Sequence, residues 1–421
     1  MRKVPDMEYQ SLSKLFHMST SSSRYEDNKN LAMSRRDSDS SFSTGIVTDA
    51  GELYLAVPRE LSVLNEKVLR HERTVSARMR QLPQIAQSAL IRGLVIDEIF
   101  CTNDIEGVHS TRRQISDLLE SVDDEDGVGV SDQQKRKRFR EMAKLYLELT
   151  NKDHILPQSP EDIREVYDCI MVGEDMVGIE PDGKLFRSKG VDIIGNGSRI
   201  IHRGIEPEDR IVDVLSKMLD LVGSNEVPDI YSSIMSHYIF EYAHPFYDGN
   251  GRTGRYLLAL YLSRPLSRPT ALSLSRVISE NRDQYYRAFK TVEDPLNHGE
   301  LTFFVETMME LIRVAQDEII SNLEDKGERL DDVTMNLDEV QKDHGLSQKS
   351  ADIVFQLAQH ELFGLFPDVP SDEIAKHIGL KKPMTRRYTS ELEEKVLIRT
   401  VSKRPLRFAL TDEAKKRLGI V

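Results

Sequence analysis

A twelve-residue stretch from His244 to Arg255, HPFYDGNGRTGR, holds the side chains most suited to chemistry. It combines a histidine, an aspartate, three glycines, an asparagine and two arginines, and the apolar run YLLALYL follows at once. Glycines let the backbone approach a ligand closely, and a helix that starts after them presents unpaired N–H groups and its positive dipole end. The stretch therefore predicts an anion site at a helix N-terminus.

The charged residues fit a phosphate chain with a base beside it. Arg252 and Arg255 lie three apart, hence on one helical face, and can grip a multiply charged phosphate. Asp248 would repel phosphate unless a cation lay between them, which is how Mg²⁺ is usually held. His244 titrates near neutrality and can take a proton from an incoming hydroxyl. Phe246 alternates with these polar groups, so we expect it to point into the core.

Other patterns of this kind are missing from the sequence. It has no GxxxxGK[ST] loop and no kinase catalytic loop. A zinc site is also disfavoured, because His244 has no HExxH or cysteine partner. The simplest alternative is a glycine-rich turn with incidental charges, but a turn requires neither two arginines nor a histidine.

Composition sets the class of protein. The chain has 421 residues, 39% hydrophobic and 30% charged, which predicts two or three globular domains. Two cysteines, Cys101 and Cys169, are too few for a disulfide framework. We find no apolar run long enough for a membrane span and no signal-peptide core, so we expect a cytoplasmic bacterial protein. The net charge of −13 argues against a chain devoted mainly to nucleic acid.

The elements that must position the motif are mostly helical. Residues 11–45 contain eleven serines among scattered charges, which predicts a disordered leader over residues 1–45. After it, apolar residues recur at three- and four-residue spacing. We expect helices over 61–79, 83–100, 131–149, 160–172, 208–222, 228–243, 250–263, 281–293 and 300–324.

One segment breaks the helical pattern. Residues 183–205 alternate β-branched and polar residues around GNG, which predicts a β-hairpin. A small hairpin on a helical body must pack on helices or move. It is either a decorative loop or a flap whose open strand edge holds a peptide partner by adding a strand.

Residues 346–421 form a separate module. SDEIAKHIGL predicts a short helix ending at Gly379, KPMTRRYTSELEEKV a second helix, and LIRTVSKRPLRFALTD a two-stranded wing. This order resembles a winged helix-turn-helix module. From Ser371 to Val421 there are 13 Lys and Arg against 7 Asp and Glu, a net +6 in a chain of net −13. The module suits DNA phosphates, although such modules also dock proteins or dimerise.

The motif carries a specific family resemblance. HPFYDGNGRTGR is similar to the Fic family signature HxFx(D/E)GNGRxxR at all eight specified positions, and the resemblance covers roughly residues 84–325. Fic enzymes are mostly adenylyltransferases, which move AMP from ATP to a protein hydroxyl and release pyrophosphate. A related Fic reaction, phosphorylation, goes with a lysine at the position of Gly251, so the glycine favours AMP transfer.

The resemblance implies a role for each motif residue. His244 would be the general base that deprotonates the target Ser, Thr or Tyr, and Asp248 would bind Mg²⁺. Arg252 would hold the phosphate chain of ATP, and Arg255 would grip its γ-phosphate. The phosphate cradle would comprise Gly249, Asn250 and Gly251.

A second stretch, TNDIEGV, looks like the family's inhibitory signature [ST]xxxE[GN]. Thr102 and Glu106 are four apart and share one helical face, and Gly107 can terminate the helix. If Glu106 pairs with Arg255, that arginine cannot bind the γ-phosphate. The resemblance therefore implies an enzyme autoinhibited by a helix that precedes the core.

Weaker matches extend the implied site. Gly183, Arg187, Val191 and Ile193 fall on the flap, where family members hold the target backbone and the nucleotide. Tyr285, in RDQYYRAF with Tyr286, resembles a tyrosine near the adenine pocket, although a helical tyrosine is more often a core residue.

Together these observations predict a mainly α-helical Fic-type bundle with a β-hairpin flap, followed by a winged helix-turn-helix domain. Its function would be Mg²⁺- and ATP-dependent protein adenylylation. Two alternatives remain: a DNA-binding regulator whose Fic domain senses nucleotide, and removal of AMP by the same site with Glu106 positioning water. The expected domains are the leader 1–45, N-terminal helices 46–125 including the inhibitory helix, a catalytic core 126–330 and the module 346–421.

Overall fold

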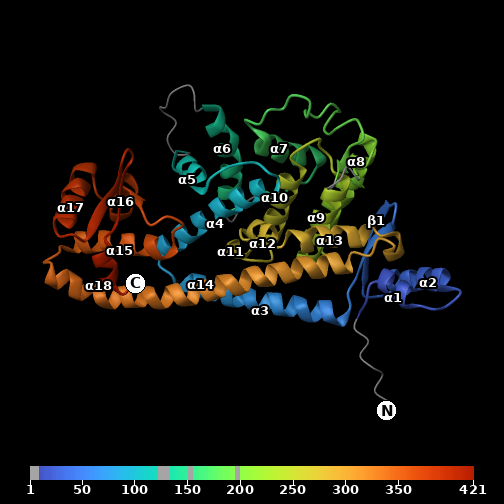
Figure 1. Ribbon diagram of the computed structural model, residues 1–421, viewed down its shortest axis with the longest axis horizontal. Helices are drawn as coiled ribbons and strands as arrows, with labels where there is room; N and C mark the ends of the chain where they lie inside the picture. The colour runs from blue at the N-terminus through green and yellow to red at the C-terminus, as the bar shows by residue number, and fades with distance from the viewer. Residues whose placement is uncertain (1–8, 122–132, 150–154, 195–199) are drawn as a thin grey trace, which may run out of the picture. The chain divides into compact units, whose positions relative to one another are not determined.

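The structure is a computed structural model that describes residues 9–121, 133–149, 155–194 and 200–421. Most of these residues are helical, which confirms the predicted fold class, and small β-hairpins and a short sheet complete the fold (Figure 1). Among the described residues no helix is both long and apolar enough to cross a membrane.

The chain divides into two compact units. Unit 1 comprises Met1–Glu72 and Asp97–Ala315, and unit 2 comprises Arg73–Ile96 and Gln316–Val421. Three long helices contribute residues to both units: α3 (Arg59–Gln81), α4 (Gln84–Ile105) and α14 (Thr302–Asp343).

The prediction of a disordered leader is wrong for residues 9–45. This segment is folded, and only residues 1–8 of the predicted leader lie outside the described residues. Its order comes from a side-chain cap at Ser11 on α1 and from polar partners far along the chain, neither of which composition reveals. The N-terminal elements are α1 (Leu12–Met18), α2 (Arg24–Arg36) and a hairpin of β1 (Ser41–Thr48) and β2 (Gly51–Ala56).

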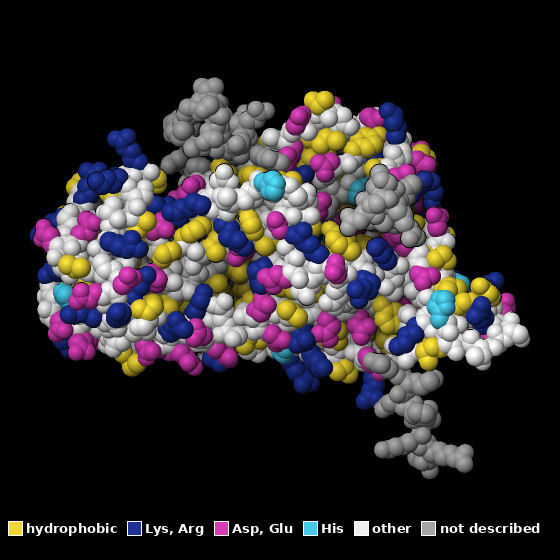
Figure 2. All heavy atoms as spheres, in the orientation of Figure 1, with side chains coloured by type: hydrophobic (Ala, Val, Ile, Leu, Met, Phe, Trp, Pro, Cys, Tyr) yellow, Lys and Arg dark blue, Asp and Glu magenta, His cyan; other side chains and the backbone are white. Residues whose placement is uncertain are grey.

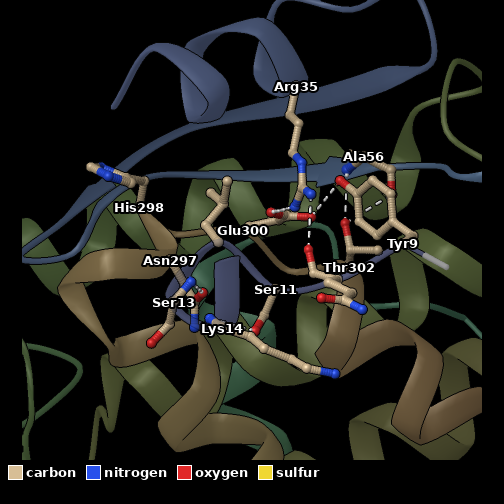
Figure 3. A network of polar contacts seen from close by, with 12 residues as sticks. Tyr9, Ser11, Ser13, Lys14, Arg35, Ala56, Asn297, His298, Glu300 and Thr302 are labelled. Atoms are coloured by element: carbon tan, nitrogen blue, oxygen red, sulfur yellow. Dashed lines mark hydrogen bonds and ion pairs between the residues drawn. The ribbon is translucent and has the colours of Figure 1, made fainter. Parts of the chain in front are cut away.

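A buried carboxylate anchors this N-terminal segment (Figure 3). Glu300 is 1% exposed, and its side chain accepts a hydrogen bond of 2.6 Å from the Tyr9 hydroxyl and pairs with Arg35 at 2.9 Å. Asn297, close by in the sequence, accepts from the Ser13 N–H at 2.8 Å. The anchor residues lie about 260 to 290 positions beyond the segment that they hold.

The body of unit 1 is a helical bundle. Helix α9 ends just before His244, the first residue of the motif, and α10 contains its last residues, Asn250 to Arg255. Most residues of α9 and α10 are buried, including polar ones such as His237 and Arg252. The two helices pack against each other near the centre of Figure 1. The helices of this body are α5 (Arg112–Ser121), α6 (Gln133–Glu148), α7 (Pro160–Met171), α8 (Glu208–Gly223), α9 (Asp229–Ala243), α10 (Asn250–Leu262), α11 (Arg268–Ala271), α12 (Leu274–Glu280) and α13 (Arg282–Glu293).

The predicted hairpin is present but shorter than the 183–205 segment. Strands β3 (Asp192–Ile194) and β4 (Ile200–Arg203) pair antiparallel, with Ile193 opposite His202. Residues 195–199, which include the predicted GNG turn, lie outside the described residues.

Helix α14 runs well past the expected end at residue 324. Its apolar stripe continues through the buried residues Leu330, Val333 and Val340, which pack into the core of unit 2. The helix therefore fills the stretch that the predicted domain boundaries left as a connection before residue 346. Tertiary packing extends it where the sequence alone looks mostly polar.

Unit 2 contains the predicted helix, turn, helix and hairpin in that order. The first helix ends at Gly379 as expected, and the hairpin gains a third strand, giving the order β5-β7-β6. Two flanking helices, α15 and α18, complete the unit. Its elements are α15 (Gln348–Phe363), β5 (Val369–Pro370), α16 (Ser371–Ile378), α17 (Lys382–Glu394), β6 (Ile398–Lys403), β7 (Leu406–Leu410) and α18 (Asp412–Leu418).

Candidate active site

His244 stands at the sharp turn where α9 ends. Its backbone has φ 48° and ψ 60°, the left-handed conformation, and its N–H donates to Phe240 O at 3.0 Å. Few non-glycine residues adopt this conformation, and histidine is among the more tolerant. The turn sends the chain into the loop that leads to α10.

Asn250 and Phe246 fix that loop. The Asn250 side chain accepts from Phe246 N at 2.9 Å and donates to Phe246 O at 2.8 Å. The Phe246 ring is fully buried, as predicted, and stacks on Tyr167 with ring centroids 3.6 Å apart. The Asn250 side chain is thus engaged with the loop, so any contribution of this residue to an anion cradle would come from its backbone.

Arg187 braces the same loop from outside the motif. It is 1% exposed, and its guanidinium donates to the main-chain oxygens of His244 at 2.7 Å and Ala243 at 3.2 Å. It also donates to Lys189 O at 2.6 Å and Ile205 O at 2.7 Å. A planar fork with several fixed donors suits this multiple contact. Arg187, predicted as a flap residue that touches the target, therefore supports the loop that begins at His244.

A carboxylate holds the chain that carries Arg187. Glu208, at the start of α8, accepts from the N–H groups of Lys184, Leu185 and Phe186 at 2.7–2.9 Å. Gly183 lies beside the same carboxylate, where a Cβ would meet Glu208 Cδ at 2.5 Å. Sequence reasoning missed Glu208, because an acidic residue in a first helical turn is common and gives no sign of what it binds.

The N-terminus of α10 has the geometry of an anion site. Gly249 caps the helix with φ 80°, a conformation that glycine adopts without strain. The first recorded helical bond runs from Thr253 N to Gly249 O at 3.0 Å. The N–H groups of the turn before it point out of the helix end, where the dipole favours negative charge.

Two carboxylates flank Arg252 at this end. Arg252 is 2% exposed and donates to Glu174 at 2.5 Å, while its other guanidinium nitrogen lies 3.7 Å from Asp248. The Asp248 side chain is 51% exposed, and its Oδ1 also accepts from Gly249 N at 2.7 Å. An exposed carboxylate beside an anion site fits a Mg²⁺ ion that shares its ligands with phosphate. Glu174 was not predicted.

Arg255 lies one turn further along and is held by α4. Its Nε donates to Thr102 Oγ1 at 2.8 Å, and its Nη2 donates to Thr102 O at 3.1 Å and to Glu106 Oε1 at 2.6 Å. Glu106 thus pairs with Arg255 as expected, and Thr102 contacts the same arginine. Gly107 ends the helix with φ 71°.

The Glu106 carboxylate covers the first turn of α10. A Cβ at Gly251 would collide with Glu106 Oε1 and would lie 2.8 Å from its Cδ and 2.9 Å from Arg255 Nη1. Burial alone raises the pKa of Glu106, but the charge and hydrogen bond of Arg255 outweigh it and lower the pKa below its ordinary value. An ionised carboxylate therefore occupies the edge of the predicted phosphate cradle.

The electrostatics keep His244 neutral. Burial lowers the pKa of His244 to about 4, and the charges of His202 and Arg187 act in the same direction. Nearby, burial raises the pKa of Glu241 to about 7, and its Oε1 has no hydrogen-bond partner in the described part of the chain. Sequence reasoning missed Glu241, although it precedes His244 by only three residues.

The two adjacent tyrosines, Tyr285 and Tyr286, differ in exposure. Tyr285, predicted to touch the nucleotide, is 2% exposed, and its hydroxyl lies 2.8 Å from His237 Nε2. This is the packing of a core residue. Its neighbour Tyr286 is 45% exposed, and the charge of Glu106 contributes to raising its pKa, after burial. Tyr286 is thus the member of the pair on the surface of the site.

The predicted hairpin contacts, Val191 and Ile193, are both half-buried. Val191 O accepts from Gly204 N at 3.0 Å, and Ile193 pairs with His202 across the strands. The His202 ring ties the hairpin to the body: Nε2 lies 2.8 Å from Tyr242 O and Nδ1 lies 3.0 Å from Glu293. Their role in binding a nucleotide or a target stays a prediction.

Comparison with known proteins matches this region to one family. Residues 157–262 match the model of the Fic/DOC family, and that range includes α7 to α10 and the hairpin. Two solved structures from bacteria and one from an animal resemble the chain. A Fic family protein from Desulfovibrio desulfuricans is 21% identical with a TM-score of 0.47, covering 82% of this chain and 96% of its own.

The other two structures match a smaller share of this chain. Fic-1 from C. elegans, residues 134 to 508, is 20% identical with a TM-score of 0.44, covering 63% of this chain and 74% of its own. A Fic domain containing signaling protein from Bacteroides thetaiotaomicron is 14% identical with a TM-score of 0.45, covering 61% of this chain and 95% of its own.

Proposed function

We propose, from the premise that residues 157–262 are a Fic/DOC family domain, that this chain is a protein adenylyltransferase. Proteins of this family are generally transferases. The proposed reaction moves AMP from ATP to a Ser, Thr or Tyr hydroxyl of a target protein and releases pyrophosphate. The observation that carries the proposal is a neutral histidine, a helix N-terminus and two buried arginines on one rigid loop and helix.

In the proposed step, the target oxygen bonds to the α-phosphorus of ATP, and the bond from that phosphorus to the pyrophosphate oxygen breaks. The hydroxyl proton passes to His244. A pKa of about 4 leaves the imidazole neutral at pH 7, so it can accept that proton. The negative charge of a bound triphosphate would raise this pKa and make the base stronger.

The α10 N-terminus would hold the phosphates. Its outward N–H groups and Arg252 are in place without any rearrangement of the loop, because Asn250 and Arg187 already fix the backbone. Asp248 would hold Mg²⁺ at the exposed edge of this site. When bound, the ion would neutralise charge on the phosphates.

The proposed resting state is autoinhibited. Arg255 is the group best placed to hold the γ-phosphate. Its guanidinium already pairs with the Glu106 carboxylate, with Nη2 and Oε1 2.6 Å apart. The Glu106 carboxylate also lies over Gly251, so a phosphate there would meet a like charge at short range. ATP could then bind only with its phosphates displaced. Release of Glu106 would be the activating event.

The target would bind at the hairpin. Strands β3 and β4 form a two-stranded sheet, and therefore each has an edge that no other strand of that sheet covers. A peptide can add to such an edge through main-chain hydrogen bonds, which places its hydroxyl by backbone geometry rather than by side-chain identity.

The test compares transfer from ATP labelled at the α- or the γ-phosphate, with Mg²⁺ and a lysate as the source of targets. Glu106→Gly should raise transfer of the α-label at least tenfold over wild type, because Arg255 is released. The γ-label should not be transferred. Adding His244→Ala should abolish the signal, and mass spectrometry of the labelled proteins would identify the modified side chain.

Asp104→Gly provides a matched control on the same helical turn. Asp104 pairs with Arg282 instead of Arg255, and its side chain is 53% exposed. This variant should stay as inactive as wild type. Equal activation by both glycine variants would mean that loosening of the helix end, not the loss of the Glu106 contact, relieves the inhibition. No activation by Glu106→Gly would refute autoinhibition.

A further inference from the structure

Unit 2 carries a basic surface that the proposed reaction does not use. Helix α17 and the β6–β7 hairpin expose Lys and Arg side chains for which no ion pair is recorded in the described chain. In Figure 2, dark-blue side chains gather over α16 and α17 at the upper left. We name these residues the basic surface: Lys376, Lys381, Arg386, Arg387, Arg399, Lys403 and Arg404.

We propose that the basic surface binds duplex DNA, with α17 in the major groove and the β6–β7 hairpin beside it on the backbone. The order of α16, turn, α17 and hairpin gives a second helix supported by the first, which is the arrangement that presents a helix to DNA. This proposal concerns unit 2 alone and does not depend on AMP transfer.

Helix α17 has one face buried and one free. Thr385, Thr389 and Leu392 are buried and pack toward α15 and α16, following a helical spacing. Arg386, Arg387 and Ser390 are exposed on the remaining surface. A helix of 13 residues is about 20 Å long, enough to follow a major groove through several base pairs.

The hairpin is fixed against the end of the same helix. Thr400 on β6 donates to Glu393 of α17 through its N–H at 3.0 Å and its hydroxyl at 2.6 Å. Along β6, Arg399 and Lys403 are both exposed, although a bulge between Thr400 and Ser402 interrupts the alternation of the strand. The helix and the hairpin therefore form one rigid basic surface.

Charge is segregated along residues 316–421 of unit 2. Residues 316–343, the part of α14 in this unit, contain ten Asp and Glu against three Lys and Arg. Helix α18 lies against this acidic segment: Arg417 is 3.9 Å from Asp343, and a Cβ at Gly419 would meet Asp332 at 3.3 Å. A polyanion would therefore approach α17 and the hairpin but be repelled from the α14 side. This segregation favours nucleic acid over a partner of mixed charge.

The expected affinity is that of electrostatic binding by a small module. If four or five of the basic residues contact phosphates, the logarithm of the binding constant should fall with the logarithm of salt concentration with a slope of about −4. Bidentate arginine contacts to guanine would add sequence preference on top of this term.

The experiment measures fluorescence anisotropy of labelled duplex DNA with the full-length protein, without ATP, over a range of salt. Wild type should bind at low salt. Arg386→Ala with Arg387→Ala should weaken binding about tenfold or more and make the salt slope shallower by about 2, one unit for each lost phosphate contact. Both arginines are exposed, so circular dichroism and the melting temperature should not change.

Lys416→Ala is the matched control, since Lys416 is also exposed but lies on α18 beside the acidic segment. It should leave the affinity and the slope unchanged. The proposal fails if wild type does not bind DNA at low salt, if the double variant binds as well as wild type, or if the control weakens binding as much. Tighter binding of single-stranded RNA than of duplex DNA would also overturn it.

Discussion

The guanidinium of Arg187 is hydrogen-bonded to the main-chain oxygen of His244, 2.7 Å away and 57 residues further along the chain. The same group holds Ala243 O and Ile205 O, so it joins the end of α9 to the segment that follows the hairpin. A left-handed residue at a helix end needs such support to keep one geometry. The position of the proposed base thus depends on a residue outside the motif.

Replacing Arg187 should therefore cost both stability and rate. Arg187→Ala leaves buried main-chain oxygens without their donor, and we expect the free energy of unfolding to fall by about 3 kcal/mol. In the Glu106→Gly background, kcat for AMP transfer should fall more than KM for ATP rises. Denaturant unfolding and initial rates would measure both.

Arg203→Ala is the appropriate comparison, because Arg203 is on the hairpin but pairs with Asp192 at an exposed site. It should change the free energy of unfolding by no more than about 0.5 kcal/mol. If Arg187→Ala were as mild as this control, the hydrogen bonds to His244 would have no role in positioning the loop.

The pH dependence of the Glu106→Gly enzyme should report the low pKa of His244. A base must be deprotonated to act, so activity is lost as pH falls through its pKa. With that pKa near 4, kcat/KM should stay flat from neutral pH to about pH 5 and fall only below it. Initial rates in buffers of constant ionic strength would test this. An acid limb centred near pH 6.5 would show an ordinary, solvated histidine instead.

The Glu106 contact makes a separate pH prediction. Its pKa is depressed in the folded state, so the stability that the pair contributes is present above the ordinary pKa of a glutamate and is lost only as pH falls through the lower, folded value. Mild acidification should therefore not activate the wild-type enzyme. Activity that rises between pH 7 and pH 5 in wild type, but not in Glu106→Gly, would contradict this contact.

Gly251 and Glu106 should be thermodynamically coupled. In wild type, Gly251→Ala forces its new methyl group against the Glu106 carboxylate and should destabilise the fold by about 1 kcal/mol or more. In the Glu106→Gly background the carboxylate is gone, and alanine is the better helix former. The same substitution should then cost clearly less, because only the close contact with Arg255 Nη1 remains. A double-mutant cycle by thermal unfolding measures this difference, and additive effects would exclude the contact.

The parts of the site that lie within one short segment were predictable. Within HPFYDGNGRTGR, the Asn250 to Phe246 bonds and the glycine cap fix the loop locally. Thr102 and Glu106 lie about one turn apart at the end of α4, and both reach Arg255. In both cases the spacing of residue types and the local conformation carry the information. The periodicity of apolar residues predicted most of the long helices of unit 1 for the same reason.

Contacts between distant segments were not predictable. Nothing near Arg187 in the sequence shows that its acceptors are carbonyl groups, and nothing near Arg252 points to Glu174. The burial of Tyr285 next to the exposed Tyr286 has a related cause, because adjacent helical residues differ by about 100° in direction and packing decides which of them faces the core. Only packing decides such cases.

The N-terminal segment is the largest of these differences, and it can be tested directly. Arg35 connects buried Glu300 to Gln10 O, at 2.9 and 2.8 Å. Arg35→Ala would leave the Glu300 carboxylate buried without its cation, a change that costs about 3 kcal/mol in comparable pairs. We expect residues 9–36 to undock at a lower denaturant concentration than the bundle unfolds. Limited proteolysis should then cut within this range before it cuts elsewhere.

Arg36→Ala controls for loss of an arginine at the same helix end. Arg36 is 34% exposed and pairs with Asp37 and, at 3.8 Å, with Glu52, so its removal should change little. Early cleavage in Arg35→Ala but not in Arg36→Ala would show that the buried pair, and not the charge of α2, orders the segment. Equal cleavage of wild type and both variants would mean that α1 and α2 are held by their apolar contacts, with Glu300 a minor contributor.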